Sequence, residues 1–211
     1  MHRVTRQLLA CGIASGIVFF VVGLGQAFTR AGFDLRHNAI SQLSLGDLGW
    51  VQITSFIVTG LLAIACAVGA RRALAGQPGG TWGPRLIGMF GVGLIIAGLF
   101  PPDPGFGFPP GAPPGPVMPM SSHAMLHAVG FFVSMLGAIA GTIVFARRFA
   151  ARGERAWVAY CVASAVATPL LIALSIAFMS WSGVIVAFAG AVPFGWVAAM
   201  AARVQAELAT G

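Results

Sequence analysis

The sequence predicts an all-α protein, a polytopic transmembrane bundle of six helices arranged as three helical hairpins. Hydrophobic residues make up 58% of the 211 residues and charged residues only 8%, whereas a soluble domain is about one quarter charged. The mean hydropathy is +0.90. Apolar runs recur with about the 20-residue length that crosses the hydrocarbon core of a bilayer. Backbone polar groups must be satisfied inside lipid, so these runs should be helices.

Six apolar runs follow one another along the chain. We expect spans at Leu8–Phe28, Trp50–Ala70, Arg85–Phe100, Ala124–Ala146, Ala156–Phe178 and Gly183–Ala202. The third run is the shortest. The spans form a single membrane domain over residues 1–211, with outer loops 29–49, 101–122 and 179–183 and inner loops 71–84 and 147–155.

Arginine predicts the orientation of these spans. Arginines precede the first span, fill both inner loops and follow the last span, and only Arg30 and Arg36 fall on the other face. The positive-inside rule therefore predicts both termini in the cytoplasm and a location in the cytoplasmic membrane. A net charge of +7 would indicate nucleic acid in a soluble protein. Here it belongs to loop anchors, so the expected partner is the lipid bilayer and not nucleic acid.

Most of the remaining ionisable residues gather at the outer face. Ionisable groups near membrane depth are costly and indicate function. This face therefore holds the candidate site, while the two glutamates lie inside. The outer set is Asp34, Asp47, Asp103, His37, His123 and His127.

The first outer loop contains a short helical pattern between Asn38, a predicted N-cap, and Gly46, a predicted stop. If the helix extended back to Asp34, then Asp34, His37, Ser41 and Ser44 would share one face. Two interpretations follow. The segment is an interfacial helix whose polar face meets water and headgroups, or it folds back and lines a site.

The second outer loop is rich in proline and carries Asp103 in the run Phe100-Pro101-Pro102-Asp103-Pro104. Proline at this density stiffens a chain into extended geometry and excludes a helix. We favour a rigid linker over a lid or a partner-docking strip.

The fourth span opens with His123 and His127, one helical turn apart, so both imidazoles should point the same way and could share a metal. Small residues continue this face, which indicates packing against another helix and places the histidines inside the bundle. They are Gly130, Ser134, Gly137 and Gly141.

A metal at this pair would need a third ligand, from His37, Asp34 or Asp103. Zinc accepts two or three histidines with a carboxylate. Nearby thioethers make Cu(I) the less favoured alternative; they belong to Met118, Met120 and Met125. The competing interpretation is that both histidines hydrogen-bond Ser and Asp groups at the bundle mouth without metal.

Two stretches resemble a known family. One is Asn38-Ala39-Ile40-Ser41-Gln42-Leu43-Ser44 before a span containing Phe56 and Gly60, and the other is Phe100-Pro101-Pro102-Asp103 followed by Ser122-His123 and Leu126-His127. This pattern resembles the domain-of-unknown-function 998 membrane proteins, whose members often carry Ser-Glu-Leu-Gly in place of the Ser41–Ser44 run. The resemblance implies a six-helix integral membrane protein of bacteria or archaea.

Three functions remain open. The first is an outward-facing site that binds a metal or a small polar or lipid-headgroup ligand, made from Asp34, His37, Ser41, Asp103, His123 and His127. The second is a zinc-dependent intramembrane lipid hydrolase in which Asp34 or Asp103 acts as the base. The third is an accessory subunit that docks its glycine-rich faces on a membrane-protein partner or on another copy of itself. A transporter is less favoured, because no ionisable residue falls at mid-membrane.

Overall fold

The computed structural model describes residues 2–210, with side chains for residues 3–209. Within that range, six helices are long and apolar enough to cross a membrane. They confirm the six predicted spans, and each occupies the predicted stretch of chain with somewhat different ends. The helices are α1 (His2–Thr29), α2 (Gly49–Ala73), α3 (Trp82–Leu99), α4 (Ser122–Ala151), α5 (Arg155–Ala177) and α6 (Ser182–Thr210).

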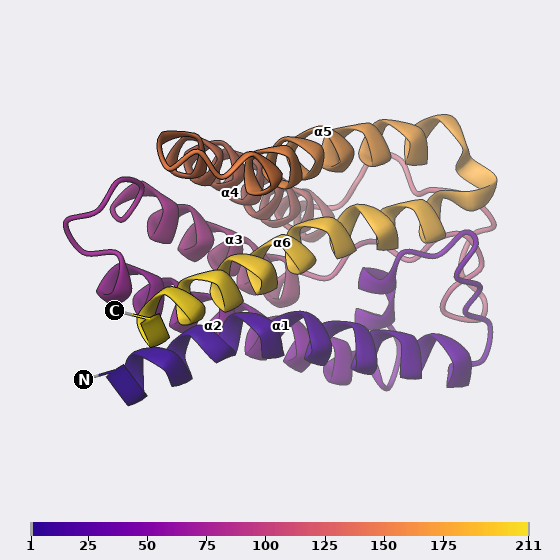
Figure 1. Ribbon diagram of the computed structural model, residues 1–211. Coiled ribbons are helices and arrows are strands. Elements are labelled where there is room, and N and C mark those ends of the chain that lie inside the picture. The colour runs from indigo at the N-terminus through magenta and orange to yellow at the C-terminus, as the bar shows by residue number, and fades with distance from the viewer. Residues whose placement is uncertain (1, 211) are drawn as a thin grey trace.

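Both ends of the chain lie at the same end of the bundle (Figure 1). We call it the terminal end; it also carries the α2–α3 and α4–α5 connections. The opposite end, called the loop end, carries the three longer or irregular connections. They contain two 3-10 helices, η1 (Ile40–Ser44) and η2 (Met179–Trp181).

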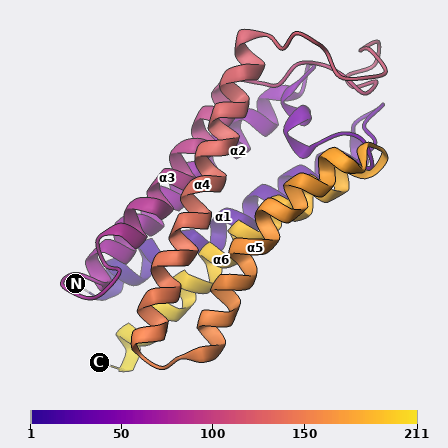
Figure 2. The ribbon, with the colours of Figure 1, turned by 90° about the horizontal axis from the view of Figure 1, so that it is seen from above.

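The helices form a closed ring in chain order. Each packs against its sequence neighbours, and α6 returns to pack against α1. The ring is uneven. Toward the loop end, the α5–α6 hairpin diverges from α4 (Figure 2).

Glycines bring the α3 and α4 backbones close together. A Cβ atom on Gly130 would lie 2.5 Å from the backbone nitrogen of Ala97 and 2.8 Å from the carbonyl oxygen of Gly93. A Cβ atom on Gly137 would lie 2.9 Å from the Leu86 carbonyl oxygen. The prediction that the small-residue face of α4 packs against another helix is confirmed, since small residues allow helices to approach in lipid.

Ion pairs join the helices at the terminal end. Glu207 of α6 accepts from Arg148 and Arg152, each at an N–O distance of 2.7–2.8 Å. Glu154 accepts from Arg152 and from Arg203 of α6, at 2.8 Å in both cases. The side chain of Arg148 is 2% exposed. This network ties α6 to α4 and to the α4–α5 connection.

The first long connection differs from the predicted helix. A short helix forms inside the predicted range as η1, but its N-cap is Ala39 in place of Asn38, and helix does not extend back to Asp34. The buried Asn38 side chain is used elsewhere. Its Oδ1 accepts from the backbone N–H of Asp34 at 2.9 Å, and its Nδ2 donates to the Phe106 carbonyl at 3.4 Å. An Asn carboxamide can satisfy turn backbone in this way in place of capping a helix.

The proline-rich α3–α4 connection packs against the first connection. Gln42 Nε2 donates to the Gly105 carbonyl at 3.1 Å, and the Phe108 ring is buried against Phe33 at a centroid distance of 5.2 Å. The interpretation of this loop as a rigid linker is therefore incomplete. It is anchored by a buried aromatic side chain and forms part of a pocket wall.

Candidate functional site

Two adjoining pockets lie at the loop end, between segments far apart in the sequence. The first, called the deep pocket, has a volume of about 70 Å³ and is lined by α1, η1, α2, α3, α4 and α6. The second, called the entrance pocket, has a volume of about 290 Å³ and lies among the connections and the starts of α4 and α6. Ala39, Ser41, His127 and Val186 line both pockets.

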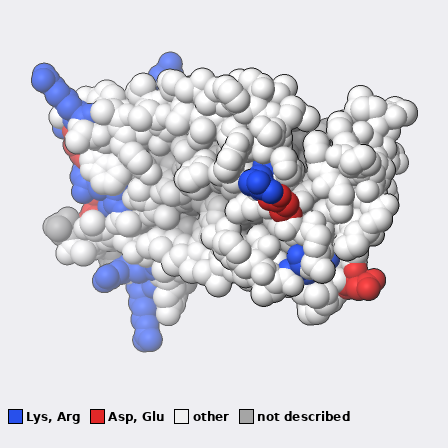
Figure 3. Space-filling model, turned by 90° about the vertical axis from the view of Figure 1, so that its right-hand side faces the viewer, with Lys and Arg blue, Asp and Glu red and all other residues white. Residues whose placement is uncertain are grey.

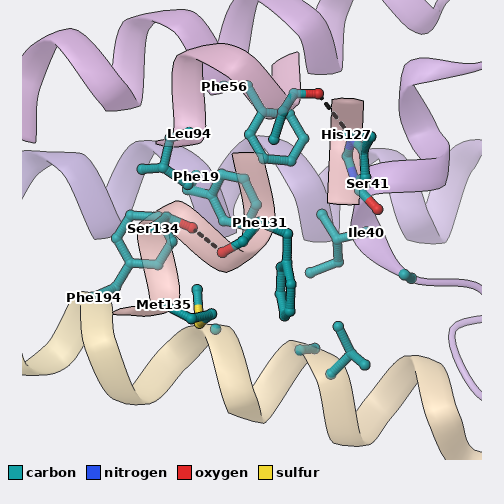
Figure 4. A pocket seen from close by; sticks show the side chains of 15 residues that line it. Phe19, Ile40, Ser41, Phe56, Leu94, His127, Phe131, Ser134, Met135 and Phe194 are labelled. Carbon is teal, nitrogen blue, oxygen red and sulfur yellow. Dashed lines mark hydrogen bonds between the residues drawn. The ribbon is translucent and has the colours of Figure 1, made fainter. Parts of the chain in front are cut away.

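Apolar side chains dominate the deep pocket (Figure 4). Phe19, Phe56 and Phe194 come from three different helices, and the Phe19 ring lies 5.1 Å from Phe56 and 5.0 Å from Phe194 between centroids. Figure 4 shows Ser41 and His127 at the end of this pocket nearer the loop end. The three phenylalanines lie in three separate spans, so no local sequence pattern indicated this pocket.

His127 is held in one orientation by the end of α3. Its Nδ1 lies 2.8 Å from the Ala97 carbonyl oxygen and 3.0 Å from that of Phe100. Two carbonyl oxygens can only accept, so Nδ1 carries the proton. These carbonyls belong to the last turn of α3, where helix carbonyls lack intrahelical partners. In the neutral imidazole, Nε2 then carries a lone pair.

His123 has different surroundings, although it is one turn from His127. Its side chain is exposed, and its ring meets Phe100 edge-on at 5.7 Å. Both predicted metal ligands were expected to lie inside the bundle, and for His123 that prediction is wrong. The Nδ1 of His127 is also committed to α3. Among residues 3–209, no three His, Cys, Asp or Glu side chains are grouped as a metal site. The structure therefore gives no support to zinc or copper at His123, His127 and His37.

Asp34 does not line either pocket. It forms an exposed ion pair with Arg36, whose Nη2 lies 2.7 Å from Oδ2, and it accepts the Arg36 backbone N–H at 2.9 Å. These hydrogen bonds from Arg36 lower the pKa of Asp34 to about 2. The loop end is otherwise mostly uncharged at its surface (Figure 3).

Asp103, His37 and Ser41 line the entrance pocket together with His127. Asp103 Oδ2 accepts the Ser121 backbone N–H at 2.8 Å, just before α4 begins. Hydrogen bonds from Ser121 lower the pKa of Asp103, which is therefore a carboxylate at neutral pH. A lowered pKa makes both Asp34 and Asp103 weak bases, so the hydrolase hypothesis gains no support from either.

With the pockets described, the chain can be compared with known proteins. Residues 13–203 match the family described as "Protein of unknown function (DUF998)". The chain belongs to the DUF998 family. The matched range covers both pockets and every candidate residue. No curated protein and no solved structure matches the chain. Together with its six apolar helices, membership makes this DUF998 protein a multi-pass integral membrane protein.

Sequence reasoning missed Arg30 in this DUF998 protein. Its guanidinium donates to the Leu43 carbonyl at 3.2 Å and to the Leu45 carbonyl at 2.7 Å, at the end of η1. It also lies 5.3 Å from the centroid of the Phe108 ring. Burial lowers the pKa of Arg30. The available signal is the position of Arg30 on the otherwise arginine-poor face.

Replacing Arg30 with methionine should loosen η1 and the pocket wall. The variant loses hydrogen bonds from a charged donor to two carbonyls, at a cost of about 1.5 kcal/mol. Amide hydrogen exchange over residues 40–45 of the DUF998 protein should accelerate about tenfold. The matched control is Arg36→Met, because Arg36 pairs only with exposed Asp34. Equal acceleration in both variants would show that Arg30 does not hold this segment.

Proposed function

We propose that this DUF998 protein binds an amphiphilic, lipid-like molecule in the two adjoining pockets. One observation carries the proposal: a pocket whose lining includes the polar side chains of His37, Asp103 and Ser41 continues, through Ser41 and His127, into a pocket walled by phenylalanine. Ligand sites are concave and mostly apolar, with a few polar groups that fix orientation. The polar end of the ligand occupies the entrance pocket and an apolar tail occupies the deep pocket.

The position of the pockets in the bundle supports a ligand that comes from the membrane. α4 and α6 supply facing walls of the deep pocket, and the hairpin that includes α6 diverges from α4 at this end (Figure 2). A tail can thus enter from the bilayer while the head stays near the interface. Each buried methylene contributes about 0.8 kcal/mol against water. The arginine distribution predicts that this end faces away from the cytoplasm.

A side chain that fills the deep pocket should strongly weaken the binding of lipids. Gly190 of α6 lines this pocket, and a Cβ atom there would meet nothing within 4 Å. Gly190→Leu therefore fills the pocket without a backbone clash. We expect at least tenfold weaker one-to-one binding of 1,2-dioctanoyl-sn-glycerol and of dioctanoyl phosphatidic acid, measured by native mass spectrometry of the purified protein.

Gly25→Leu is the matched control. Gly25 lies on the exposed side of α1, and its added Cβ would also have nothing within 4 Å. This variant should bind like the wild type. The proposal fails if the wild-type protein binds neither lipid, or if Gly190→Leu binds them as tightly as Gly25→Leu.

A further inference from the structure

The entrance pocket has fewer free hydrogen-bond donors than free acceptors among its side chains. Its side-chain donors are mostly turned toward protein acceptors. Gln42 Nε2 donates to the Gly105 carbonyl, and Ser182 Oγ donates to the His37 carbonyl at 3.3 Å. His37 Nε2 lies 3.9 Å from the Asp34 carboxylate. These contacts leave few donors for a ligand.

Acceptors, in contrast, remain unused. The His127 ring presents Nε2 because Nδ1 donates to the end of α3, and within the described part of the chain nothing hydrogen-bonds to Nε2. Asp103 accepts its hydrogen bonds from Ser121, and a carboxylate has further acceptor sites. The Ser41 hydroxyl, which lines both pockets, likewise has no partner among residues 3–209 and can donate or accept.

The charges that line the pockets also disfavour an anionic ligand head. Among the described residues, no arginine or lysine lines either pocket. Asp103 places a negative charge in the entrance pocket, since hydrogen bonds from Ser121 keep its pKa low. A phosphate head in this pocket would meet a like charge with no Arg or Lys beside it, and like charges repel.

We propose that the head of the bound amphiphile is an uncharged hydroxyl that donates its hydrogen bond to His127 Nε2, where the entrance and deep pockets meet. This inference rests on the proposed amphiphile binding and names the chemical class of the ligand. A buried acceptor left without a donor costs the full desolvation of that group. The pocket should therefore reject an analogue that lacks the hydroxyl hydrogen.

Three dioctanoyl lipids with the same tails test the inference. They are 1,2-dioctanoyl-sn-glycerol, its 3-O-methyl ether, which cannot donate, and dioctanoyl phosphatidic acid, which is anionic. We expect the wild-type protein to bind the glycerol lipid about tenfold more tightly than either analogue, measured as dissociation constants by native mass spectrometry. Equal affinity for the alcohol and the ether, or tighter binding of phosphatidic acid, would overturn the inference and leave amphiphile binding intact.

The variant His127→Asn tests whether Nε2 of His127 causes the preference for the alcohol over the ether. The asparagine amide nitrogen occupies roughly the place of Nδ1 and can still donate to the α3 carbonyls, but no atom replaces Nε2. The ratio of alcohol to ether affinity should fall to near one. A ratio unchanged from wild type would show that His127 is not the acceptor. If none of the three lipids binds the wild-type protein, the proposed function itself is wrong, which is a different outcome from a loss of head preference.

Discussion

Replacing Glu207 with glutamine should destabilise the protein by about 3–5 kcal/mol, the cost of leaving one member of a buried ion pair without its partner. Arg148, whose side chain is 2% exposed, would keep only uncharged acceptors, which include the Gln77 side chain and the Pro78 carbonyl. Both are neutral, so the guanidinium charge would stay uncompensated. The free energy of unfolding in mixed micelles, titrated with sodium dodecyl sulfate, measures this loss.

Glu154 is the matched control for this prediction. Its two partners, Arg152 and Arg203, are 38% and 26% exposed, and solvent reduces the value of such pairs to about 1 kcal/mol or less. Glu154→Gln should therefore be much milder than Glu207→Gln. A second comparison uses the double variant Arg148→Met with Glu207→Leu, which removes both charges and should recover part of the stability. Equal losses in the two glutamine variants would contradict the argument.

The spans could be predicted from sequence because their cause is local. Apolar length and the need to satisfy backbone groups in lipid act on each run independently of the others. The small-residue face of α4 was predictable for a similar reason, since glycine and serine at spacings of three and four permit close approach of any neighbouring helix. Neither argument depends on which helices are neighbours.

The geometry of the candidate site depends on which segments become neighbours in the fold, and the sequence predicted that geometry less well than the spans. His123 and His127 lie one turn apart on α4 but have different neighbours at the end of α3. The carbonyls of Ala97 and Phe100 hold one ring, and the Phe100 side chain meets the edge of the other. Asp34 was expected in the site, but Arg36, two residues away, holds it outside. Arg30 acts across 13–15 residues, a partnership that no local pattern indicates.

The α3–α4 contact links stability to the pocket. Gly130 closely approaches Gly93 and Ala97 of α3, and the Ala97 carbonyl also holds His127, which lies three residues before Gly130 on α4. Separation of the two helices at this point would therefore also remove the hydrogen bond that orients the imidazole. The α3–α4 contact therefore both stabilises the bundle and orients the imidazole that presents Nε2.

Gly130→Leu should accordingly cost about 3 kcal/mol or more, at the upper end of the range for overpacked sites. Its Cβ atom would lie 2.5 Å from a backbone nitrogen, and backbone cannot rotate away as a flexible side chain can. Detergent titration measures the stability, and lipid binding should weaken in parallel because His127 loses its acceptors on α3. Gly25→Leu adds the same side chain to open space on α1 and should leave both quantities unchanged. A Gly130→Leu protein that is as stable as Gly25→Leu would mean that α3 and α4 do not approach at this glycine.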